Sequence, residues 1–323
     1  MITPQTPHQT PHQTTPPEAP LGPPKDLPQE PSQEPLKETL PKNKWYDWYK
    51  EFDQHHSPEA RQQWYSAIAQ AYRWARPTYP DELVDKVVAK ADLKTGSSIL
   101  EIGCGPGIAT QAFAARGFEM QCVEPSPAAC ELARQVAGNF TGSVTVTNST
   151  FEAFDLNDRT FDAVLAATSF HWVSPAVACR KSAAALSPGG SLILLWATPP
   201  QLNPDLCEAL QPTYEKYQLA DKIQYHSRQQ AYYQANFDEF AQMIGDSEWF
   251  ARTAVELETH QSQYSIEKYV ALLSTLSDYI ALPDDTRKSL LDDLAERLET
   301  LQGEKSLTLT HWFAAQVAPL IGL

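Results

Sequence analysis

The sequence predicts an α/β fold, in which a mostly parallel sheet carries helices on both of its faces. Residues 99–102 (Ile-Leu-Glu-Ile) form a short apolar run of the kind expected for a strand buried on both sides. The run leads into residues 103–107 (Gly-Cys-Gly-Pro-Gly), after which the apolar spacing becomes helical. Strand-like and helix-like segments alternate further along the chain, which is typical of a doubly wound sheet.

Length, charge and cysteine content narrow the class of protein. At 323 residues the chain can form one large domain with attachments or two small domains. A formal net charge of −15 disfavours binding to phosphate backbones, so we expect no nucleic-acid partner. The five cysteines are scattered and include no Cys-x-x-Cys pair, which indicates reduced thiols in a cytoplasm and no metal site. No apolar stretch approaches the roughly 20 residues that cross a bilayer, and the N-terminus lacks a signal-peptide pattern. We therefore expect a soluble protein without a membrane partner.

The N-terminal segment differs in composition from the rest of the chain. Residues 1–42 hold nearly half of the 26 prolines, a tandem Thr-Pro-His-Gln repeat and almost no large apolar residue. Such a segment buries too little surface to offset its ordering entropy, so we predict a disordered, partly polyproline-II tail. The tail could recruit a partner domain, but a dispensable tether is the favoured interpretation.

Capping residues and periodicity place the elements that follow. Ser57-Pro58-Glu59 is a helix start, with an N-cap serine, a proline at the first helical position and an acid in the first turn. One predicted helix follows Gly107. The others span residues 58–75, 81–90, 128–136, 179–186, 205–217, 265–280 and 284–302. The predicted strands span residues 99–102, 119–124, 143–148, 161–167, 191–196, 250–260 and 306–313, with a turn at 187–190. Residues 225–240 fit neither period clearly.

Three motifs resemble those of one enzyme family. The loop at residues 101–107 resembles motif I of the class I S-adenosylmethionine-dependent methyltransferases. Residues 76–80 (Arg-Pro-Thr-Tyr-Pro) resemble a segment before the first core helix of many small-molecule members. Residues 170–172 (Phe-His-Trp), after Ala-Thr-Ser, are similar to a bacterial group related to trans-aconitate methyltransferase. The resemblance implies a Rossmann-like, seven-stranded sheet whose seventh strand runs antiparallel beside the fifth.

The resemblance also implies a division of the chain beyond the tail. Residues 43–80 would form a helical lid that closes over the cofactor, and residues 81–323 the methyltransferase domain. Within that domain, residues 81–200 would bind the cofactor. Residues 201–323 would add the acceptor-side cap and the last two strands.

Charge and glycine spacing favour S-adenosylmethionine over a dinucleotide in this loop. A dinucleotide fingerprint, Gly-x-Gly-x-x-Gly, would place its last glycine one residue after Gly107. Glu101 would repel a pyrophosphate, but it suits a ligand that carries an ammonium and a sulfonium. Gly103, Gly105 and Gly107 let the backbone adopt the turn and let the ligand approach without a Cβ in the way.

A second acid follows at the end of the next predicted strand. In a nucleotide-binding β-α-β unit, the acid that binds the ribose hydroxyls lies roughly 20 residues after the glycine loop. Glu124 lies at nearly this distance after Gly107. A carboxylate accepts two hydroxyl donors strongly. Pro125 and Ser126 continue the same strand end, so we assign them to the cofactor site with Glu124.

Other cofactor residues are implied by the resemblance. In the family, the residues that match Tyr72 and Arg76 tend to face the methionine end, where an arginine can pair with a carboxylate. The alternative is that Arg76 complements the dipole at a helix C-terminus. The resemblance also implies that Phe151 lies against the adenine ring, with Thr150 or Glu152 near its amino group.

The end of the fourth predicted strand should face the transferable methyl group, because ligands bind at the carboxyl ends of parallel strands. Thr168 and His171 lie there. His171 is the only side chain of that loop with an ordinary pKa near neutrality, so it is the candidate for deprotonating the acceptor. It could equally shape the pocket wall.

The sequence therefore predicts a cytoplasmic methyltransferase that uses S-adenosylmethionine on a small-molecule acceptor. The in-line displacement needs alignment and exclusion of water, and it needs no metal. Two alternatives remain open: a methyltransferase-like scaffold with the proline-rich tail as adaptor, and an NAD-dependent oxidoreductase. An aromatic surround suits either an apolar acceptor or the sulfonium, although packing explains it equally well: Trp64, Tyr72, Tyr79, Trp172 and Trp196.

Overall fold

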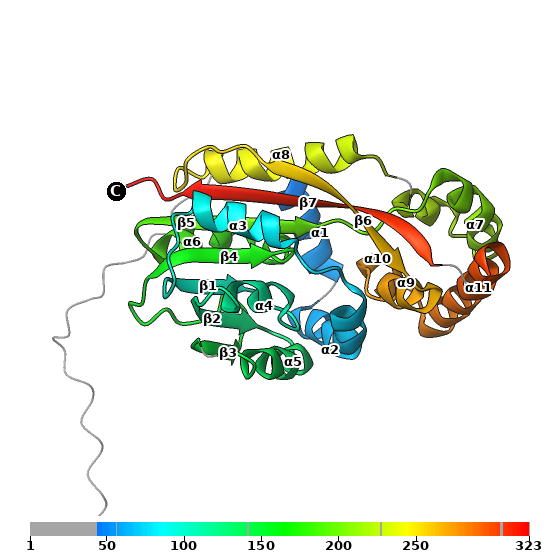
Figure 1. Cartoon of the computed structure of the whole chain (residues 1–323), viewed down its shortest axis with the longest axis horizontal. Coiled ribbons are helices and arrows are strands. Elements are labelled where there is room, and N and C mark those ends of the chain that lie inside the picture. The colour runs from blue at the N-terminus through cyan, green and yellow to red at the C-terminus, as the bar shows by residue number, and fades with distance from the viewer. Residues whose placement is uncertain (1–43, 56, 141, 227, 304–305, 323) are drawn as a thin grey trace, which may run out of the picture. The chain divides into compact units, whose positions relative to one another are not determined.

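A computed structural model describes residues 44–55, 57–140, 142–226, 228–303 and 306–322 (Figure 1). The predicted tail of residues 1–42 lies outside them. The described helices are α1 (Lys44–His55), α2 (Pro58–Ala75), α3 (Asp81–Lys90), α4 (Ile108–Ala114), α5 (Pro127–Ala137), η1 (Phe170–Trp172), α6 (Pro175–Ala184), α7 (Pro204–Lys216), η2 (Ala220–His226), α8 (Gln230–Asp246), α9 (Ile266–Leu273), α10 (Ser277–Ile280) and α11 (Asp284–Gln302). None of these helices combines the length and the apolar character needed to span a membrane.

The described strands form one seven-stranded sheet in the order β3-β2-β1-β4-β5-β7-β6. Its strands are β1 (Ser98–Ile102), β2 (Glu119–Glu124), β3 (Val144–Asn148), β4 (Phe161–Ala167), β5 (Leu186–Ala197), β6 (Glu256–Tyr264) and β7 (Leu307–Pro319). The β1, β2, β3, β4 and β5 pairings are parallel, whereas β7 is antiparallel to both β5 and β6. The predicted fold class is confirmed, including the inserted antiparallel seventh strand.

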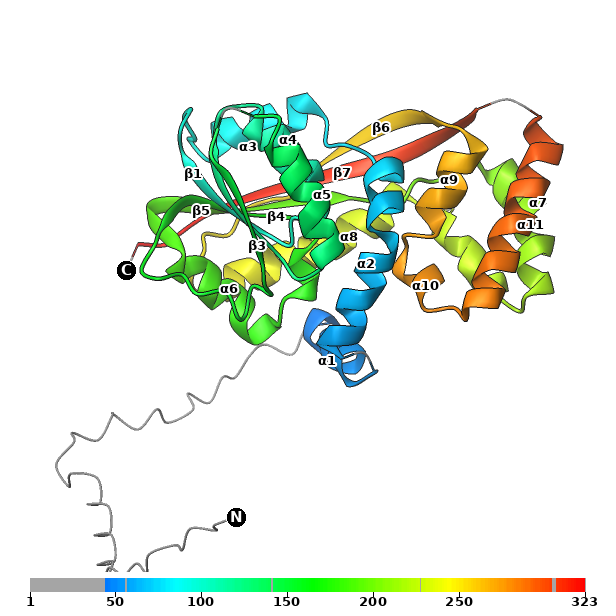
Figure 2. The ribbon, with the colours of Figure 1, turned by 90° about the horizontal axis from the view of Figure 1, so that it is seen from below.

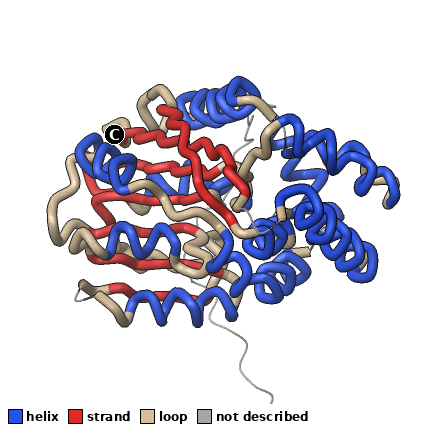
Figure 3. The backbone as a smooth tube through the Cα atoms, turned by 45° about the vertical axis from the view of Figure 1, so that its right-hand side comes forward, coloured by secondary structure: helices blue, strands red, loops and turns tan. Residues whose placement is uncertain are grey.

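Helices cover both faces of the sheet, so its central strands are buried on both sides (Figures 2 and 3). On one face, α3, α4 and α5 pack through residues such as Val84, Phe113 and Ala133. On the other face, α6 and α8 pack through residues such as Cys179 and Phe237. Burial on both sides explains why the β1, β4 and β5 sequences are largely apolar rather than alternating.

A third apolar cluster forms a helical cap at the end of β6 and β7, built from α7, α9, α10 and α11 (Figure 1). Its centre is a buried histidine, His226, hydrogen-bonded to Tyr214, Tyr269 and Tyr279. A buried imidazole with tyrosine partners on three different elements fixes how those elements pack.

Some predicted boundaries are wrong. Residues 187–190 lie within the span of β5 instead of preceding it as a separate turn. They form a bulge there, since the register with β4 jumps from the Phe161–Leu186 pair to the Ala163–Ser191 pair. The sixth strand begins at Glu256 rather than at residue 250, and Phe250 makes only an isolated bridge to Leu320. The predicted helix 265–280 is two helices, and the ambiguous region 225–240 contains the start of α8. Tertiary packing decides such segments, where local period is weak.

Candidate functional site

The predicted site residues surround one cavity of about 600 Å³ at the carboxyl ends of β1, β2 and β4. The lining includes thirteen of the residues that the sequence singles out: Tyr72, Arg76, Glu101, Gly103, Gly105, Glu124, Pro125, Ser126, Thr150, Phe151, Glu152, Thr168 and His171. Parallel strands end at a common edge, so residues that are far apart in sequence meet there.

Gly107 is the exception, because it does not line this cavity. It is the N-cap of α4 with φ +86°, and a Cβ there would lie 3.2 Å from Val136 Cγ2 and 3.3 Å from Ala133 Cα of α5. Its glycine is needed for the left-handed turn and the close approach of α5. The structure thus gives Gly107 a role in the turn and in the packing of α5, and its contact with a cofactor stays a prediction.

Glu101, at the end of β1, is 1% exposed. Its Oε2 accepts hydrogen bonds from the Thr110 hydroxyl at 2.6 Å and the Cys122 thiol at 3.5 Å. Its Oε1 has no hydrogen-bond partner among the described residues. Burial raises the pKa of Glu101 to about 7, although both hydrogen bonds act against that rise. A buried oxygen without a donor in a cavity wall is suited to a ligand that brings a donor of its own.

Glu124, at the end of β2, is held by the backbone of two loops. Its Oε2 accepts from the Gly105 amide at 2.9 Å and its Oε1 from the Ser126 amide at 2.8 Å. The two bonds fix the carboxylate against the glycine loop, and each oxygen keeps a further lone pair for a ligand. Burial raises the pKa of Glu124 to about 7, while the two amides lower it.

These two carboxyls predict a pH dependence of cofactor binding. With pKa values of about 7, both groups protonate as the pH falls from 8 to 6. A neutral carboxyl attracts a cation less, so we expect the affinity for S-adenosylmethionine to drop at least about 10-fold over this range. Calorimetric titrations at pH 6, 7 and 8 measure the change, and an unchanged Kd contradicts the assignment.

The same two carboxyls have the opposite effect on the stability of the ligand-free protein. Its free energy of unfolding declines as the pH rises from 4.5 towards 7, because these groups ionise at a lower pH in the unfolded chain than in the folded one.

Helix α2 forms one wall of the cavity and contacts the loops that follow β1 and β2. Gln62 Nε2 donates to the Pro125 carbonyl at 2.6 Å, and the Ser66 and Ser126 hydroxyls lie 2.9 Å apart. Arg73 Nη1 donates to the Pro106 carbonyl at 3.1 Å. The sequence motifs do not assign these three residues of α2 to the site. Their spacing at 62, 66 and 73 places them near one helix face, which is the signal that could have found them.

Arg76 lies where α2 ends and reaches across to the cap. Its Nε donates to Thr275 Oγ1 at 2.8 Å and its Nη2 to the Thr275 carbonyl at 2.9 Å. The guanidinium stacks on the Tyr72 ring, 4.7 Å from the ring centroid. The cap thus contributes Thr275, Leu276 and Ser277 to the cavity wall, a contribution that no local pattern indicates.

The end of β4 carries a strained residue and a buried histidine. Thr168 has φ +54°, and its hydroxyl accepts from the Ala197 amide and lies 2.9 Å from the Tyr79 hydroxyl. His171 packs between the rings of Trp172 and Trp196. Burial, with a further contribution from Arg76, lowers the pKa of His171 to about 4. The sequence-based premise of a near-neutral pKa is therefore wrong, and His171 is a neutral imidazole at pH 7.

The segment after β3 forms the remaining wall. Phe151 is 3% exposed, with Lys181 Nζ 5.3 Å from its ring centroid. The Glu152 carboxylate accepts from the Ser174 amide at 2.9 Å, so one of its oxygens serves a loop contact. Of the predicted aromatic surround, Tyr72, Tyr79 and Trp172 line the cavity, whereas Trp64 and Trp196 are not among its lining residues.

The chain is similar to several known proteins in sequence or in fold. Residues 99–190 match the model of a methyltransferase domain family. An uncharacterized methyltransferase of Mycobacterium bovis is 34% identical over 128 residues, which are 40% of this chain and 49% of that protein. One from Schizosaccharomyces pombe is 25% identical over 232 residues, 71% of this chain and 85% of that protein. The fold is shared with "a Putative Type II Methyltransferase" from Anaeromyxobacter dehalogenans, at a TM-score of 0.52 and 18% identity over 75% of this chain and 97% of that chain.

The fold and the cavity define an α/β protein with a cavity at the carboxyl edge of a parallel sheet. Sequence similarity then connects part of the chain to methyltransferases, and the match spans about half the length of the mycobacterial relative. Residues 99–190 are therefore similar to a methyltransferase domain, and the fold is similar to that of a methyltransferase structure.

Proposed function

We propose that this chain transfers the methyl group of S-adenosylmethionine to a small-molecule acceptor. The observation that carries the proposal is the pair of buried carboxyls, Glu101 and Glu124, on either side of the glycine loop in one cavity. A site with two acids suits a cation with ribose hydroxyls and disfavours a diphosphate. This charge pattern argues against an NAD-dependent oxidoreductase.

The residues of the cavity fit the parts of this cofactor. The unpartnered Oε1 of Glu101 would accept the ammonium, and Glu124 would accept the ribose hydroxyls. Arg76, stacked on Tyr72, would donate to the carboxylate of the methionine end. Phe151 would lie against the adenine, with Thr150 and Glu152 at its edge and Pro125 and Ser126 beside the ribose. When bound, the cofactor supplies an electrophilic methyl group on a sulfonium.

The acceptor half of the cavity is bounded by Thr168, His171 and the cap residues Thr275 to Ser277. We assign His171 there as a neutral side chain that orients the acceptor, because a pKa of about 4 makes it a weak base at pH 7. The surrounding helices exclude water from the line of displacement. The lid role of residues 43–80 and the cap role of residues 201–323 belong to the same proposal.

We further propose a cytoplasmic location, since all five cysteines are free and buried.

A thermal-shift comparison tests the ligand class. At about 100 times its Kd, a ligand that binds only the folded state stabilises it by about 2.7 kcal/mol. We therefore expect S-adenosylhomocysteine to raise the Tm by about 5 °C or more, and NAD to leave it unchanged. The reverse order would support the oxidoreductase alternative.

A metabolite screen with radiolabelled methyl donor then tests turnover. Incorporation of label into a small molecule supports the proposal. Binding of S-adenosylhomocysteine without incorporation into any acceptor class would favour the scaffold alternative, in which residues 1–42 act as an adaptor for a partner domain.

A further inference from the structure

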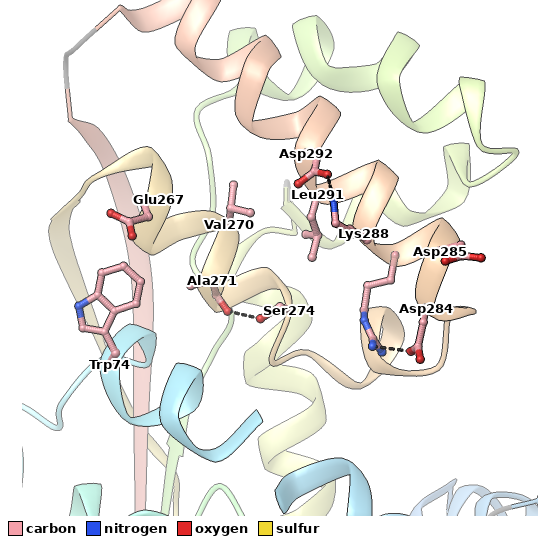
Figure 4. Close-up of a pocket in the computed structure, with 11 residues that line it drawn as sticks. Trp74, Glu267, Val270, Ala271, Ser274, Asp284, Asp285, Lys288, Leu291 and Asp292 are labelled. Carbon is pink, nitrogen blue, oxygen red and sulfur yellow. Dashed lines mark hydrogen bonds and ion pairs between the residues drawn. The ribbon is translucent and has the colours of Figure 1, made fainter. Parts of the chain in front are cut away.

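A second cavity of about 590 Å³ lies outside the cofactor site, between the end of α2 and the helices α9 and α11 (Figure 4). We call it the outer groove. Its apolar side chains come from all three helices: Trp74, Val270, Ala271 and Leu291. Trp74 is 48% exposed, so a large flat indole face is open to solvent within a concave surface. An exposed aromatic side chain in a groove marks a binding surface more often than a lone surface aromatic does.

The outer groove and the cofactor cavity are two sides of one wall. Trp74 and Ser274 line the groove, whereas Arg76 and Thr275, one or two residues further along the same segments, line the cavity. The two hydrogen bonds from Arg76 to Thr275 hold this wall together. An occupant of the groove would therefore contact the segments that bound the acceptor half of the cavity.

The charges in the groove are unbalanced. Arg287 pairs with Asp284 and Lys288 with Asp292, each at 2.6 Å, so the two cations of the lining are neutralised. Two further carboxylates, Glu267 and Asp285, make no hydrogen bond or ion pair with any described residue. Figure 4 shows Glu267 beside the Trp74 ring and Asp285 at the α11 side.

We propose that the outer groove docks a lysine- or arginine-bearing segment of a partner protein. An aliphatic stem would cover Val270 and Leu291, and its cationic head would lie over the Trp74 indole, which attracts cations through its negative face. Glu267 and Asp285 would supply the opposite charge, and the chain's net charge of −15 would speed the approach of a basic partner. This surface is separate from the proposed methyl transfer and does not depend on it.

Fluorescence anisotropy of the full chain with a labelled eight-residue peptide of alternating lysine and alanine tests the docking site. The matched peptide contains glutamate in place of lysine. We expect the lysine peptide alone to bind, Trp74→Ala to weaken it at least 10-fold, and Glu267→Gln to weaken it at least 3-fold. The matched control is Tyr232→Ala on α8, since Tyr232 is similarly exposed at 45% but lies away from the groove. It should change the Kd less than 2-fold.

Three results would overturn the proposal. The first is that the lysine peptide does not bind. The second is that Trp74→Ala binds the peptide as tightly as the unaltered chain does, which would indicate general attraction to an acidic protein. The third is that sedimentation shows a dimer that Trp74→Ala dissociates, which would make a second copy the occupant. An unchanged circular dichroism spectrum and Tm in Trp74→Ala and Glu267→Gln show that both variants are folded, so a loss of peptide binding is then specific to the groove.

Discussion

Replacing Gly105 with arginine is expected to abolish binding of S-adenosylhomocysteine while the protein stays folded. Gly105 lines the cavity with φ +54°, and a Cβ built there has no heavy atom within 4 Å. The new side chain therefore has room, but only in the space that the cofactor would occupy. The left-handed backbone costs a non-glycine residue about 1–2 kcal/mol, which a protein of this size tolerates.

Gly96→Arg is the matched control for this variant. Gly96 also has a positive φ, +87°, and open space around its Cβ, but it lies before β1 and away from the cavity. The two variants carry the same change of charge and similar backbone strain. Calorimetry with S-adenosylhomocysteine and circular dichroism should show a folded, non-binding Gly105→Arg and a folded, binding Gly96→Arg. Binding by Gly105→Arg within about 3-fold of the unaltered protein would place the cofactor elsewhere.

The second large effect is expected at Glu124. We predict that Glu124→Ala lowers the affinity for S-adenosylhomocysteine about 100-fold, or about 2.7 kcal/mol. Two causes act together: the ribose hydroxyls lose a charged acceptor, and the Gly105 and Ser126 amides lose theirs, which loosens the glycine loop. Glu124→Gln keeps one acceptor oxygen and should lose less, about 10-fold.

Glu119→Ala provides the control, because Glu119 begins the same strand, is exposed and does not line the cavity. Its affinity should stay within 2-fold of the unaltered protein. Isothermal titration of all three variants with S-adenosylhomocysteine makes the comparison. If Glu124→Ala behaves like Glu119→Ala, the ribose assignment fails.

The part of the site that sequence reasoning placed is local in the chain. Glu101, the glycine loop and Glu124 belong to one β-α-β unit, in which a strand, a turn and a helix fix the geometry within about 25 residues. That two acids stand at these positions is a property of residue type, so it could be predicted without coordinates, whereas their raised pKa values follow from burial in the fold. The same local logic assigned Gly107 to the ligand, but it did not indicate that α5 packs against this glycine. Spacing alone does not say whether a glycine approaches a ligand or another helix.

The parts that sequence reasoning missed depend on contacts between distant segments. Gln62 meets Pro125, and Arg76 meets Thr275 from 199 residues away. The near-neutral pKa assumed for His171 was wrong for the same reason: its burial by Trp172, Trp196 and neighbouring segments exists only in the folded chain.

By itself, the sequence determined the α/β class, the glycine turn between β1 and α4, and the two acids that suit a cationic nucleoside ligand. Hydrophobic period, turn chemistry and side-chain charge act over a few residues, so they can be read along the chain. Only the tertiary structure decided which side chains of α2 contact the loops of the cavity, how the cap completes its wall, and which ionisable groups lose their water. Burial and pKa depend on every segment that packs around a group, and packing is a property of the whole fold.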